Sequence, residues 1–225
     1  MRSGPDPDFP YLTETQYFPF RDPKDWKDDI IAVGGNLSPG MLLSAYEQGI
    51  FPWYNDGDPV IWQSPDPRCV IFPEKLHISS SMRKILNNRT FIIKFDENFT
   101  EVMKGCAETK RPHQNGTWIS KDIIEAYTEL HRLGWAHSAE AWQDGELAGG
   151  CYGVLMGNAF FGESMFSRKS NASKAAFLSL AEKLFDYGAA FIDCQVPTNH
   201  LLSLGGEVMA REDFLNLLDI HGVSR

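Results

Sequence analysis

The sequence predicts a mixed α/β (α+β) fold, in which helices pack on a β-sheet, preceded by a small N-terminal domain. Three observations predict it. Beyond residue 65, short apolar runs of strand length alternate with amphipathic segments of helix length. Tight-turn signals at Asp144-Gly145 and Gly157-Asn158 join three strands into an antiparallel meander. A turn-rich stretch with several prolines favours a boundary, which we place between residues 1–64 and 65–225.

The N-terminal domain contains one clear helix signal. Residues 1–28 show no regular period and are expected to be extended. Ser38 suits the N-cap of a helix, Pro39 its first turn and Gly49 its C-terminal stop. We therefore expect a helix over residues 39–48.

The main domain should begin with strands over residues 69–72 and 91–95 and a helix over residues 80–87 between them. Asp96 and Ser120 each suit the N-cap of a further helix, because apolar residues recur at helical spacing after both. These two helices precede the antiparallel meander.

After the meander, a helix is expected over residues 172–187, with Gly188 as its C-terminal stop. An apolar strand over residues 190–196 follows. Helix and strand then alternate once more up to Leu218. This order predicts a mixed sheet with helices packed on it.

Composition excludes several classes of protein. With 43% hydrophobic residues the chain can bury a sizeable core, so disorder is not expected. We find no signal peptide and no apolar run of about 20 residues, the length of a membrane span. The cysteines form no CxxC pair and the histidines no HxxxH motif, so neither a metal site nor a disulfide framework is expected. The wide cysteine spacing favours the reducing cytoplasm, and because no long heptad pattern occurs we expect a monomer.

The charge distribution is uneven. A net charge of −9 argues against indiscriminate binding of nucleic acid. Residues 75–95 nevertheless contain no acidic residue and five basic ones: Lys75, Arg83, Lys84, Arg89 and Lys94. We call residues 75–95 the basic segment. It suits a phosphate backbone, and on charge alone an ordinary solvated face is the alternative.

The strand expected over residues 190–196 contains two polar residues, Asp193 and Gln195. The period of two places them on the same face, near the end of the strand at Pro197. Burying an ionised carboxylate without partners costs several kcal/mol, so Asp193 needs a partner or a function. The two interpretations are a catalytic pair beside a cleft and a structural aspartate that caps the following loop.

Glu163 is a second candidate. It shares a strand face with Phe161 and Met165, and Gly162 before it allows a close approach. A carboxylate in such surroundings suits proton transfer or the binding of an ammonium group. The alternative is an ion pair with a neighbouring basic residue, Arg168 or Lys169.

Aromatic and apolar residues offer weaker signals. Phe177, Leu180 and Leu184 form one stripe of a helix, which is typical of core packing and also of a side-chain pocket. Trp53 and Trp118 lie at the edges of elements, where each can stack on a base or cover a core. No phosphate-binding loop or dinucleotide motif occurs.

Ten motifs between Ala32 and Leu218 carry a family resemblance. In order, they are AVGGNLSPG, AYEQGIFPW, SPDPR, GTWIS, AYTELHRLGWAHSAEAW, GGCYGV, GESMFSR, NASK, IDCQ and SLGGE. In this combination the sequence resembles the bacterial leucyl/phenylalanyl-tRNA–protein transferases. The resemblance implies a small N-terminal domain and a GNAT-like (acyl-CoA N-acyltransferase-like) domain.

The same resemblance implies an activity. The family transfers Leu or Phe, and less well Met, from Leu-tRNA or Phe-tRNA to an N-terminal Arg or Lys of an acceptor protein. The transfer marks that protein for degradation by the N-degron pathway. The resemblance implies neither a cofactor nor a metal ion.

The resemblance also implies site residues. Asp193 and Gln195 match the catalytic pair, and Glu163 matches the assisting carboxylate. Trp53 and Trp118 match the aromatics around the terminal adenosine of tRNA. The basic segment would contact the tRNA backbone. The implied pocket for the transferred side chain consists of Cys151, Phe160, Met165, Phe177, Leu180, Leu184 and Ile192.

Two of these positions depart from the family pattern. Cys151 stands where a larger Met is usual, and Phe177 stands where a smaller aliphatic residue is usual. The preference between Leu and Phe is therefore open.

We expect Gln195 to accept a hydrogen bond from the attacking amine while Asp193 orients and polarises it. Glu163 would hold the cationic end of the acceptor or shuttle the proton. Two other classes remain open at this point. One is an acyl-CoA N-acyltransferase, although no pyrophosphate-binding pattern is evident. The other is a non-catalytic protein that binds aminoacyl-tRNA.

Overall fold

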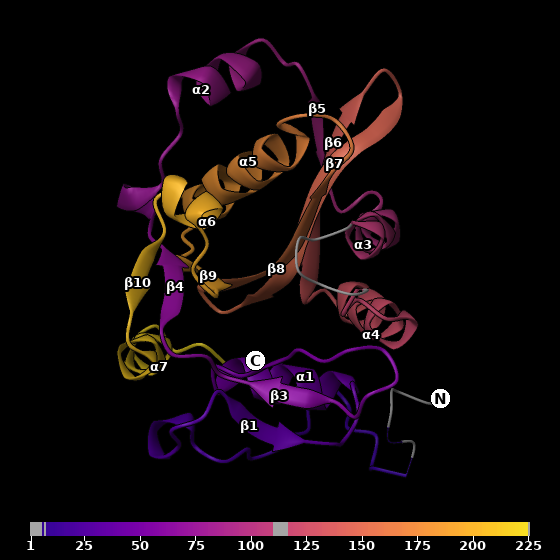
Figure 1. Cartoon of the computed structure of the whole chain (residues 1–225), viewed down its shortest axis with the longest axis vertical. Coiled ribbons are helices and arrows are strands. Elements are labelled where there is room, and N and C mark those ends of the chain that lie inside the picture. Colours follow the sequence, from indigo (N-terminus) through magenta and orange to yellow (C-terminus); the bar gives the residue numbers. More distant parts are fainter. Residues whose placement is uncertain (1–5, 7, 110–116, 225) are drawn as a thin grey trace.

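The computed structural model describes residue 6 and residues 8–109 and 117–224, which form two β-sheets surrounded by helices (Figure 1). The smaller sheet lies in the N-terminal part, at the bottom of Figure 1, and its strand order is β1-β3-β2. The elements of this part are β1 (Ile30–Val33), α1 (Pro39–Glu47), β2 (Phe51–Pro52) and β3 (Ile61–Gln63), with a short 3-10 helix at Pro23–Asp25.

The larger sheet has seven strands in the order β10-β4-β9-β8-β7-β6-β5. Strands β8 and β9 are parallel and the other neighbours are antiparallel, so the sheet is mixed. The strands are β4 (Arg68–Ile71), β5 (Ile92–Phe95), β6 (Ala136–Gln143), β7 (Glu146–Met156), β8 (Ala159–Ser167), β9 (Phe191–Gln195) and β10 (Glu207–Met209). The predicted meander is confirmed as β6-β7-β8.

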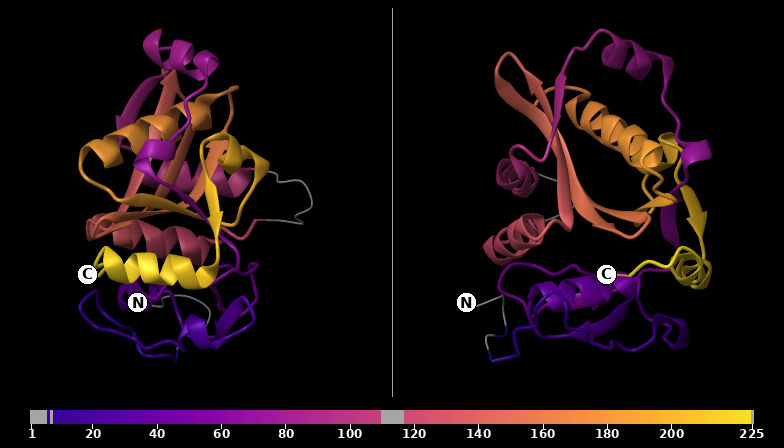
Figure 2. Two further views of the ribbon diagram at one scale, coloured as in Figure 1. Left: turned by 90° about the vertical axis from the view of Figure 1, so that its left-hand side faces the viewer. Right: turned by 180° about the vertical axis from the view of Figure 1, so that it is seen from behind.

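Helices cover both faces of the larger sheet. Helix α5 packs against the concave face, and α3 and α4 lie against the other face (Figures 1 and 2). The remaining elements of this part are the 3-10 helix Pro73–Lys75 and the helices α2 (Ser80–Asn87), α3 (Phe99–Glu108), α4 (Lys121–Arg132), α5 (Ala172–Asp186), α6 (Asn199–Ser203) and α7 (Arg211–Ile220). None of the described helices is long and apolar enough to span a membrane.

Helix α7 joins the two parts of the molecule. Its first residue, Arg211, is buried and donates hydrogen bonds to the backbone carbonyls of Trp26, Asp28 and Ser64. One hydrophobic core continues from the N-terminal sheet into the larger sheet. The division between residues 1–64 and 65–225 stays a prediction.

Gly49 follows the C-cap of α1 and lies against α7. Its φ is +71°, and a Cβ at this position would lie 2.5 Å from the Leu215 side chain. Glycine is therefore required both by the backbone conformation and by the packing.

The structure confirms most predicted elements to within a residue or two, and it corrects one predicted cap. Ser38 is the N-cap of α1 as predicted, and its hydroxyl accepts the Leu12 N–H (3.1 Å) and none from the helix. Asp96 is not the N-cap of α3. With φ at +60° it lies in the preceding turn and accepts the Ser138 N–H (2.7 Å), so Asn98 takes the cap position. The prediction for Ser120 is confirmed.

Candidate active site

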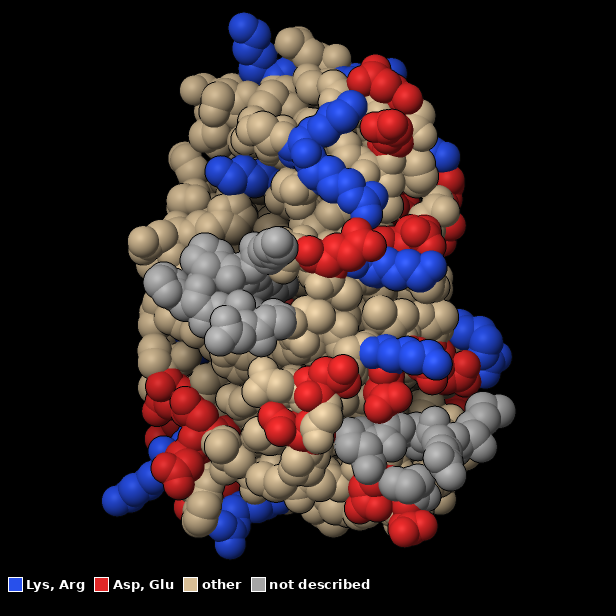
Figure 3. Space-filling model, turned by 45° about the vertical axis from the view of Figure 1, so that its right-hand side comes forward, with Lys and Arg blue, Asp and Glu red and all other residues tan. Residues whose placement is uncertain are grey.

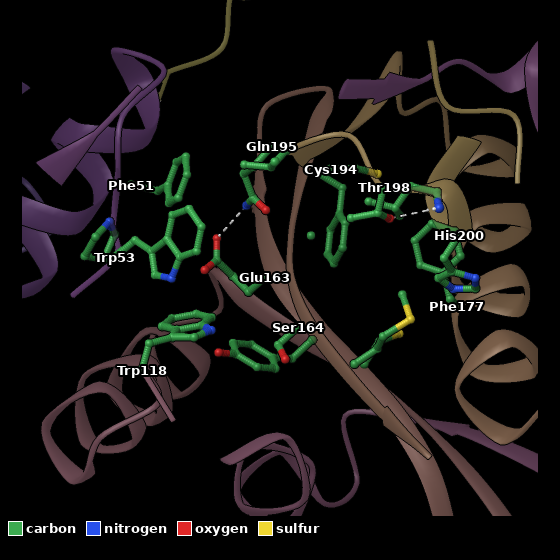
Figure 4. Close-up of a pocket in the computed structure, with 18 residues that line it drawn as sticks. Phe51, Trp53, Trp118, Glu163, Ser164, Phe177, Cys194, Gln195, Thr198 and His200 are labelled. Carbon is green, nitrogen blue, oxygen red and sulfur yellow. Dashed lines mark hydrogen bonds between the residues drawn. The ribbon is translucent and has the colours of Figure 1, made fainter. Parts of the chain in front are cut away.

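A pocket of about 400 Å³ opens between the N-terminal part, strands β7, β8 and β9, and helices α5 and α6 (Figure 4). Most of its wall is aromatic or aliphatic. Glu163 and Gln195 lie toward one end beside Trp53 and Trp118, and Phe177 lies at the opposite end. The lining residues are Phe51, Pro52, Trp53, Trp118, Cys151, Tyr152, Phe160, Gly162, Glu163, Ser164, Met165, Phe177, Cys194, Gln195, Val196, Thr198, His200 and Leu201.

The Glu163 carboxylate, on β8, is held by three donors from different elements. Its Oε1 accepts from the Tyr46 hydroxyl (2.7 Å) and from the Gln195 amide (3.1 Å), and its Oε2 accepts from the Tyr127 hydroxyl (3.4 Å). The two tyrosine hydroxyls are 2.5 Å apart. Helices α1 and α4 thus fix a carboxylate at the pocket wall.

The alternative partners expected for Glu163 are engaged elsewhere. Arg168 pairs with Glu108 (3.1 Å), and Lys169 pairs with Asp144 (3.1 Å). The ion-pair interpretation of Glu163 is therefore wrong, because the strand turns these basic residues away from the pocket and toward exposed carboxylates.

Glu163 titrates near neutral pH. Burial raises its pKa to about 7, and the negative charge of Asp193 adds to the rise, while the Tyr46 hydrogen bond opposes it. Burial also raises the pKa of Tyr46 and Tyr127 well above their usual value, so both hydroxyls stay protonated and act as donors. A carboxyl group with a pKa near 7 can take up and release a proton under physiological conditions.

Asp193 lies directly behind the pocket wall in a buried ion pair with Arg68 of β4. The guanidinium donates two hydrogen bonds to the carboxylate, of 2.8 and 2.6 Å, and the two side chains are 1% and 0% exposed. Arg68 also donates to the Gly49 carbonyl (3.1 Å) and stacks over the Phe214 ring at 4.3 Å. The ion pair thus links the larger sheet to the end of α1 and to α7.

The carboxylates of Asp193 and Glu163 both hold Gln195 in position. Its backbone adopts a left-handed φ of +56°, and its N–H donates to Asp193 Oδ1 (2.9 Å). Its side-chain amide donates to Glu163 (3.1 Å). The expectation that Asp193 polarises the side chain of Gln195 is therefore corrected. Asp193 holds the backbone, as a structural cap would, and Glu163 holds the side chain.

The seven residues expected to form the side-chain pocket divide into two groups. Cys151, Phe160, Met165 and Phe177 line the pocket. Among the described residues, Leu180, Leu184 and Ile192 are not part of the lining; they are buried in the hydrophobic cluster that contains Phe160 and Phe177. Their side chains support the wall rather than form it.

Two tryptophans lie at the Glu163 end of the pocket. Trp53 follows β2 and stacks against Phe51, with ring centroids 6.5 Å apart. Trp118, which precedes α4, lies on the same side of Glu163 in Figure 4. Both line the pocket, and together they offer flat aromatic surfaces beside the polar groups.

The basic segment lies away from the pocket, on and around α2, and most of its charges are paired. Lys75 pairs with Glu207 (2.9 Å), Arg83 with Glu182 (2.9 Å) and Lys94 with Glu97 (2.6 Å). Figure 3 shows acidic and basic side chains intermixed toward the end of the molecule where α2 lies. Within the described chain, Lys84 and Arg89 form no ion pair.

Several residues of the site were missed from the sequence. Arg68 stands at the end of a proline-rich stretch, where nothing in the pattern indicates burial. Tyr46 and Tyr127 occupy apolar helix positions and suggest ordinary core packing. His200 and Thr198 line the pocket from the loop after β9 and the start of α6, which carry no motif of their own. In the described part of the chain, no three His, Cys, Asp or Glu residues are placed to hold a metal ion.

The fold resembles several solved structures at low sequence identity. The GCN5-related N-acetyltransferase from Kribbella flavida has 12% identity and a TM-score of 0.40, over 77% of this chain and 62% of that chain. The GCN5-related N-acetyltransferase-like protein from Streptococcus suis has 14% identity and a TM-score of 0.38, over 64% of this chain and 59% of that chain.

Sequence comparison gives a far closer match. The family model described as "Leucyl/phenylalanyl-tRNA protein transferase" matches residues 70–219, and the model of the N-terminal domain of the same family matches residues 35–66. The leucyl/phenylalanyl-tRNA–protein transferase of Hahella chejuensis is 50% identical over 95% of this chain and 92% of its own length. The protein of the same name from Flavobacterium johnsoniae is 50% identical over 92% of this chain and 98% of its own length. This chain belongs to the leucyl/phenylalanyl-tRNA–protein transferase family.

Proposed function

We propose that this protein transfers Leu or Phe, and less readily Met, from aminoacyl-tRNA to an N-terminal Arg or Lys of an acceptor protein, as a cytoplasmic monomer. One observation carries the proposal: an apolar pocket has a polar end at which the Glu163 carboxylate meets the Gln195 amide. An aminoacyl ester needs both features. Its side chain requires an apolar site, and its reacting carbonyl requires groups that position an amine and take a proton.

The apolar end suits the amino-acid side chain. Cys151, Phe160, Met165 and Phe177 would surround it, and burying a Leu or Phe side chain contributes about 1.5–3 kcal/mol. A charged side chain would lie there without a partner and would be rejected. The tryptophans at the other end suit the terminal adenosine, since stacking contributes about 1–3 kcal/mol per base.

The reaction forms a C–N bond and breaks the ester C–O bond to the terminal ribose. The neutral α-amine of the acceptor attacks the carbonyl carbon, and it must lose a proton while the ribose oxygen gains one. The amide nitrogen of Gln195 is engaged with Glu163, so its carbonyl oxygen Oε1 is the atom that accepts a hydrogen bond from the amine. Positioning of this kind supplies several kcal/mol of the barrier reduction.

Glu163 rather than Asp193 takes the proton in this proposal. Glu163 lines the pocket, and its pKa is raised to about 7 by burial. Asp193 lies behind the wall, where Arg68 occupies both carboxylate oxygens. We assign Asp193 the role of a positioning residue that fixes the backbone of Gln195.

The tRNA backbone would contact the basic segment. Lys84 and Arg89 support this assignment most directly, because they carry positive charge without an acidic partner among the described residues. Lys75, Arg83 and Lys94 would have to exchange a protein carboxylate for a phosphate. We therefore expect Lys84 and Arg89 to account for most of the direct phosphate contacts.

A transfer assay tests the proposal. Radiolabelled Leu-tRNA is incubated with the enzyme and a protein that bears N-terminal Arg, and the same protein with an acetylated N-terminus is the control. We expect label on the free N-terminus only, and a large loss of transfer for Gln195→Ala. Binding of Leu-tRNA without transfer would indicate a non-catalytic binding protein. Transfer from acyl-CoA alone would indicate an acyl-CoA N-acyltransferase.

A further inference from the structure

Two cysteines meet across neighbouring strands beside the pocket. Strands β4 and β9 are antiparallel, with Ile71 opposite Ile192 and Val70 opposite Asp193. A regular ladder would next place Cys69 opposite Cys194. The register instead shifts after Val70, so that Cys69 lies opposite Gln195. Cys194 is therefore the extra residue of a β-bulge, one position from the residue that faces Cys69.

The two thiol groups lie on the same face of the sheet. Both side chains belong to the hydrophobic cluster on the α5 side, which also contains Ile71 and Ile192. Neither cysteine is in a disulfide, and each thiol perturbs the pKa of the other, as expected of neighbouring groups. In a β-bulge two residues of one strand oppose a single residue of its partner, so Cys194 and Gln195 both lie across from Cys69 and the two cysteines are neighbours between the strands.

The thiols differ in access and in acidity. Cys194 lines the pocket, whereas Cys69 is fully buried behind it. The neighbouring Cys194 side chain lowers the pKa of the Cys69 thiol, and Cys69, together with burial, raises the pKa of the Cys194 thiol. Access sets the order of reaction, because a small oxidant that enters the pocket reaches only Cys194, although the raised pKa of this thiol slows the first step. The lowered pKa of Cys69 favours it as the nucleophile of the second step.

We propose that Cys69 and Cys194 are a modification site, at which a peroxide produces a reversible disulfide that switches the neighbouring active site off. The second part of this statement rests on the proposed function. It gives Cys69 and Cys194 a role that the transfer reaction does not require of them.

The chemistry balances with the peroxide as the oxidant. The Cys194 sulfur attacks one peroxide oxygen, the O–O bond breaks, and Cys194 sulfenic acid and water form. The Cys69 sulfur then attacks the sulfenic sulfur, the S–O bond breaks, and the disulfide and a second water form. The two sulfur atoms lose two electrons in total, and the two peroxide oxygens gain them. A dithiol reductant reverses the change by thiol–disulfide exchange.

The Cys69–Cys194 disulfide would affect catalysis by moving the β-bulge at Cys194. Cys194 stands between Asp193, which is fixed by Arg68, and Gln195, which has a left-handed backbone. Drawing the two sulfurs from a non-bonded separation to a bond of about 2.05 Å shifts the bulge. The Gln195 amide would then lose its position against Glu163, which is 3.1 Å away. A misplacement of about 1 Å in an active site reduces the rate by about 10²-fold.

Peptide mapping of the wild-type protein tests the bond itself. The enzyme is treated with hydrogen peroxide, alkylated under denaturing conditions and digested with trypsin. All four cysteines lie in different tryptic peptides, and the expected product joins residues 69–75 to residues 184–211. Dithiothreitol should separate the two peptides. Alkylated Cys69 and Cys194 in the treated protein, or a bridge to Cys106 or Cys151 instead, would overturn the proposal.

Transfer activity before and after peroxide tests the consequence. We expect the wild type to lose about 10²-fold in rate and to regain it with dithiothreitol. In Cys69→Ala, peroxide can still oxidise Cys194 but no disulfide can form, so this variant should lose much less activity than the wild type. Cys106→Ala, which removes a buried thiol elsewhere, should behave as the wild type does. Equal inactivation of Cys69→Ala would contradict the switch even if the bond forms. Absence of transfer before oxidation would instead contradict the proposed function and leave the peptide result valid.

Discussion

The polar cluster behind the pocket and the basic segment around α2 contain the same kinds of side chain in opposite settings. Behind the pocket, Arg68 and Asp193 are 1% and 0% exposed and share two hydrogen bonds. On the surface, Arg83 and Glu182 are 51% and 41% exposed and meet through one contact of 2.9 Å. The buried pair fixes the positions of other groups, whereas the exposed pair is screened by solvent and contributes at most about 1 kcal/mol. Burial, more than residue type, therefore decides whether an ion pair fixes neighbouring groups in position or contributes only a weak surface attraction.

The largest effect should follow from breaking the buried pair. Arg68→Met leaves the buried Asp193 carboxylate without its cationic partner, and we expect the free energy of unfolding to fall by about 3–5 kcal/mol. Arg83→Met breaks the exposed pair and should cost less than about 1 kcal/mol. Urea unfolding followed by fluorescence measures both. Equal losses for the two variants would show that burial does not distinguish the pairs.

Removing the carboxylate at the pocket wall should have the next largest effect. Glu163→Gln keeps the shape of the side chain but cannot take a proton, and we expect kcat to fall by about 10²-fold. The wild-type rate should rise through pH about 7, because the Glu163 carboxyl loses its proton above the pKa to which burial raises it.

The pH profile separates this role from a structural one. The acceptor amine also loses its proton as the pH rises, with a pKa of about 7.7–8.0, so one rising limb should remain in Glu163→Gln. The limb near pH 7 should disappear. Glu108→Gln removes an exposed carboxylate far from the pocket and should leave the profile unchanged. If Glu163→Gln keeps both rising limbs of the pH profile, a group other than Glu163 acts as the base.

The effect of removing a tryptophan should be smaller, since Trp53 is half-buried, Trp118 is buried and neither carries a charge. Trp53→Ala should raise KM for charged tRNA about 5- to 150-fold, which corresponds to about 1–3 kcal/mol of stacking per base, and should leave kcat nearly unchanged. Trp26→Ala is the control, because Trp26 belongs to the N-terminal part and does not line the pocket. A fall in kcat at unchanged KM would instead place Trp53 in the chemical step.

The same contrast explains which parts of the site could be predicted from the sequence. Glu163, Asp193 and Gln195 stand out because each is polar within an apolar strand. The period of two does not predict their faces, because register shifts interrupt both strands: the adjacent Cys194 and Gln195 line the pocket, and Asp193 does not. Arg68 does not stand out, since its burial depends on pairing with a residue 125 positions away. The left-handed turn at Gln195 depends on the bulge between β4 and β9, which no local pattern reports.

The N-terminal sheet was missed for a different reason. Its strands have only two to four residues, too short for alternation to be visible. Tyr46 and Tyr127 have the periodicity of core residues, and their hydroxyls acquire a role only because two helices meet at Glu163. Local patterns thus predicted the elements, while contacts between distant elements determined the chemistry.

The smallest effect concerns the basic segment, and it depends on which charges are removed. Two double variants are compared. One carries both Lys84→Gln and Arg89→Gln, and the other carries both Lys75→Gln and Arg83→Gln. Each removes two positive charges and changes the net charge from −9 to −11, so each alters the long-range field of the protein alike. Only the first removes cations that are not already paired with a carboxylate within the described chain.

Any difference between the two double variants therefore reports direct phosphate contacts rather than net charge. KM for charged tRNA is measured across a series of salt concentrations. If Lys84 and Arg89 each contact a phosphate, the slope of log K against log salt should flatten by about 1.4–1.8, at 0.7–0.9 per contact. The paired double variant should flatten it less, because its cations already neutralise Glu207 and Glu182. Identical slopes would mean that the segment acts only through its overall charge, and no slope change at all would remove it from the path of the tRNA.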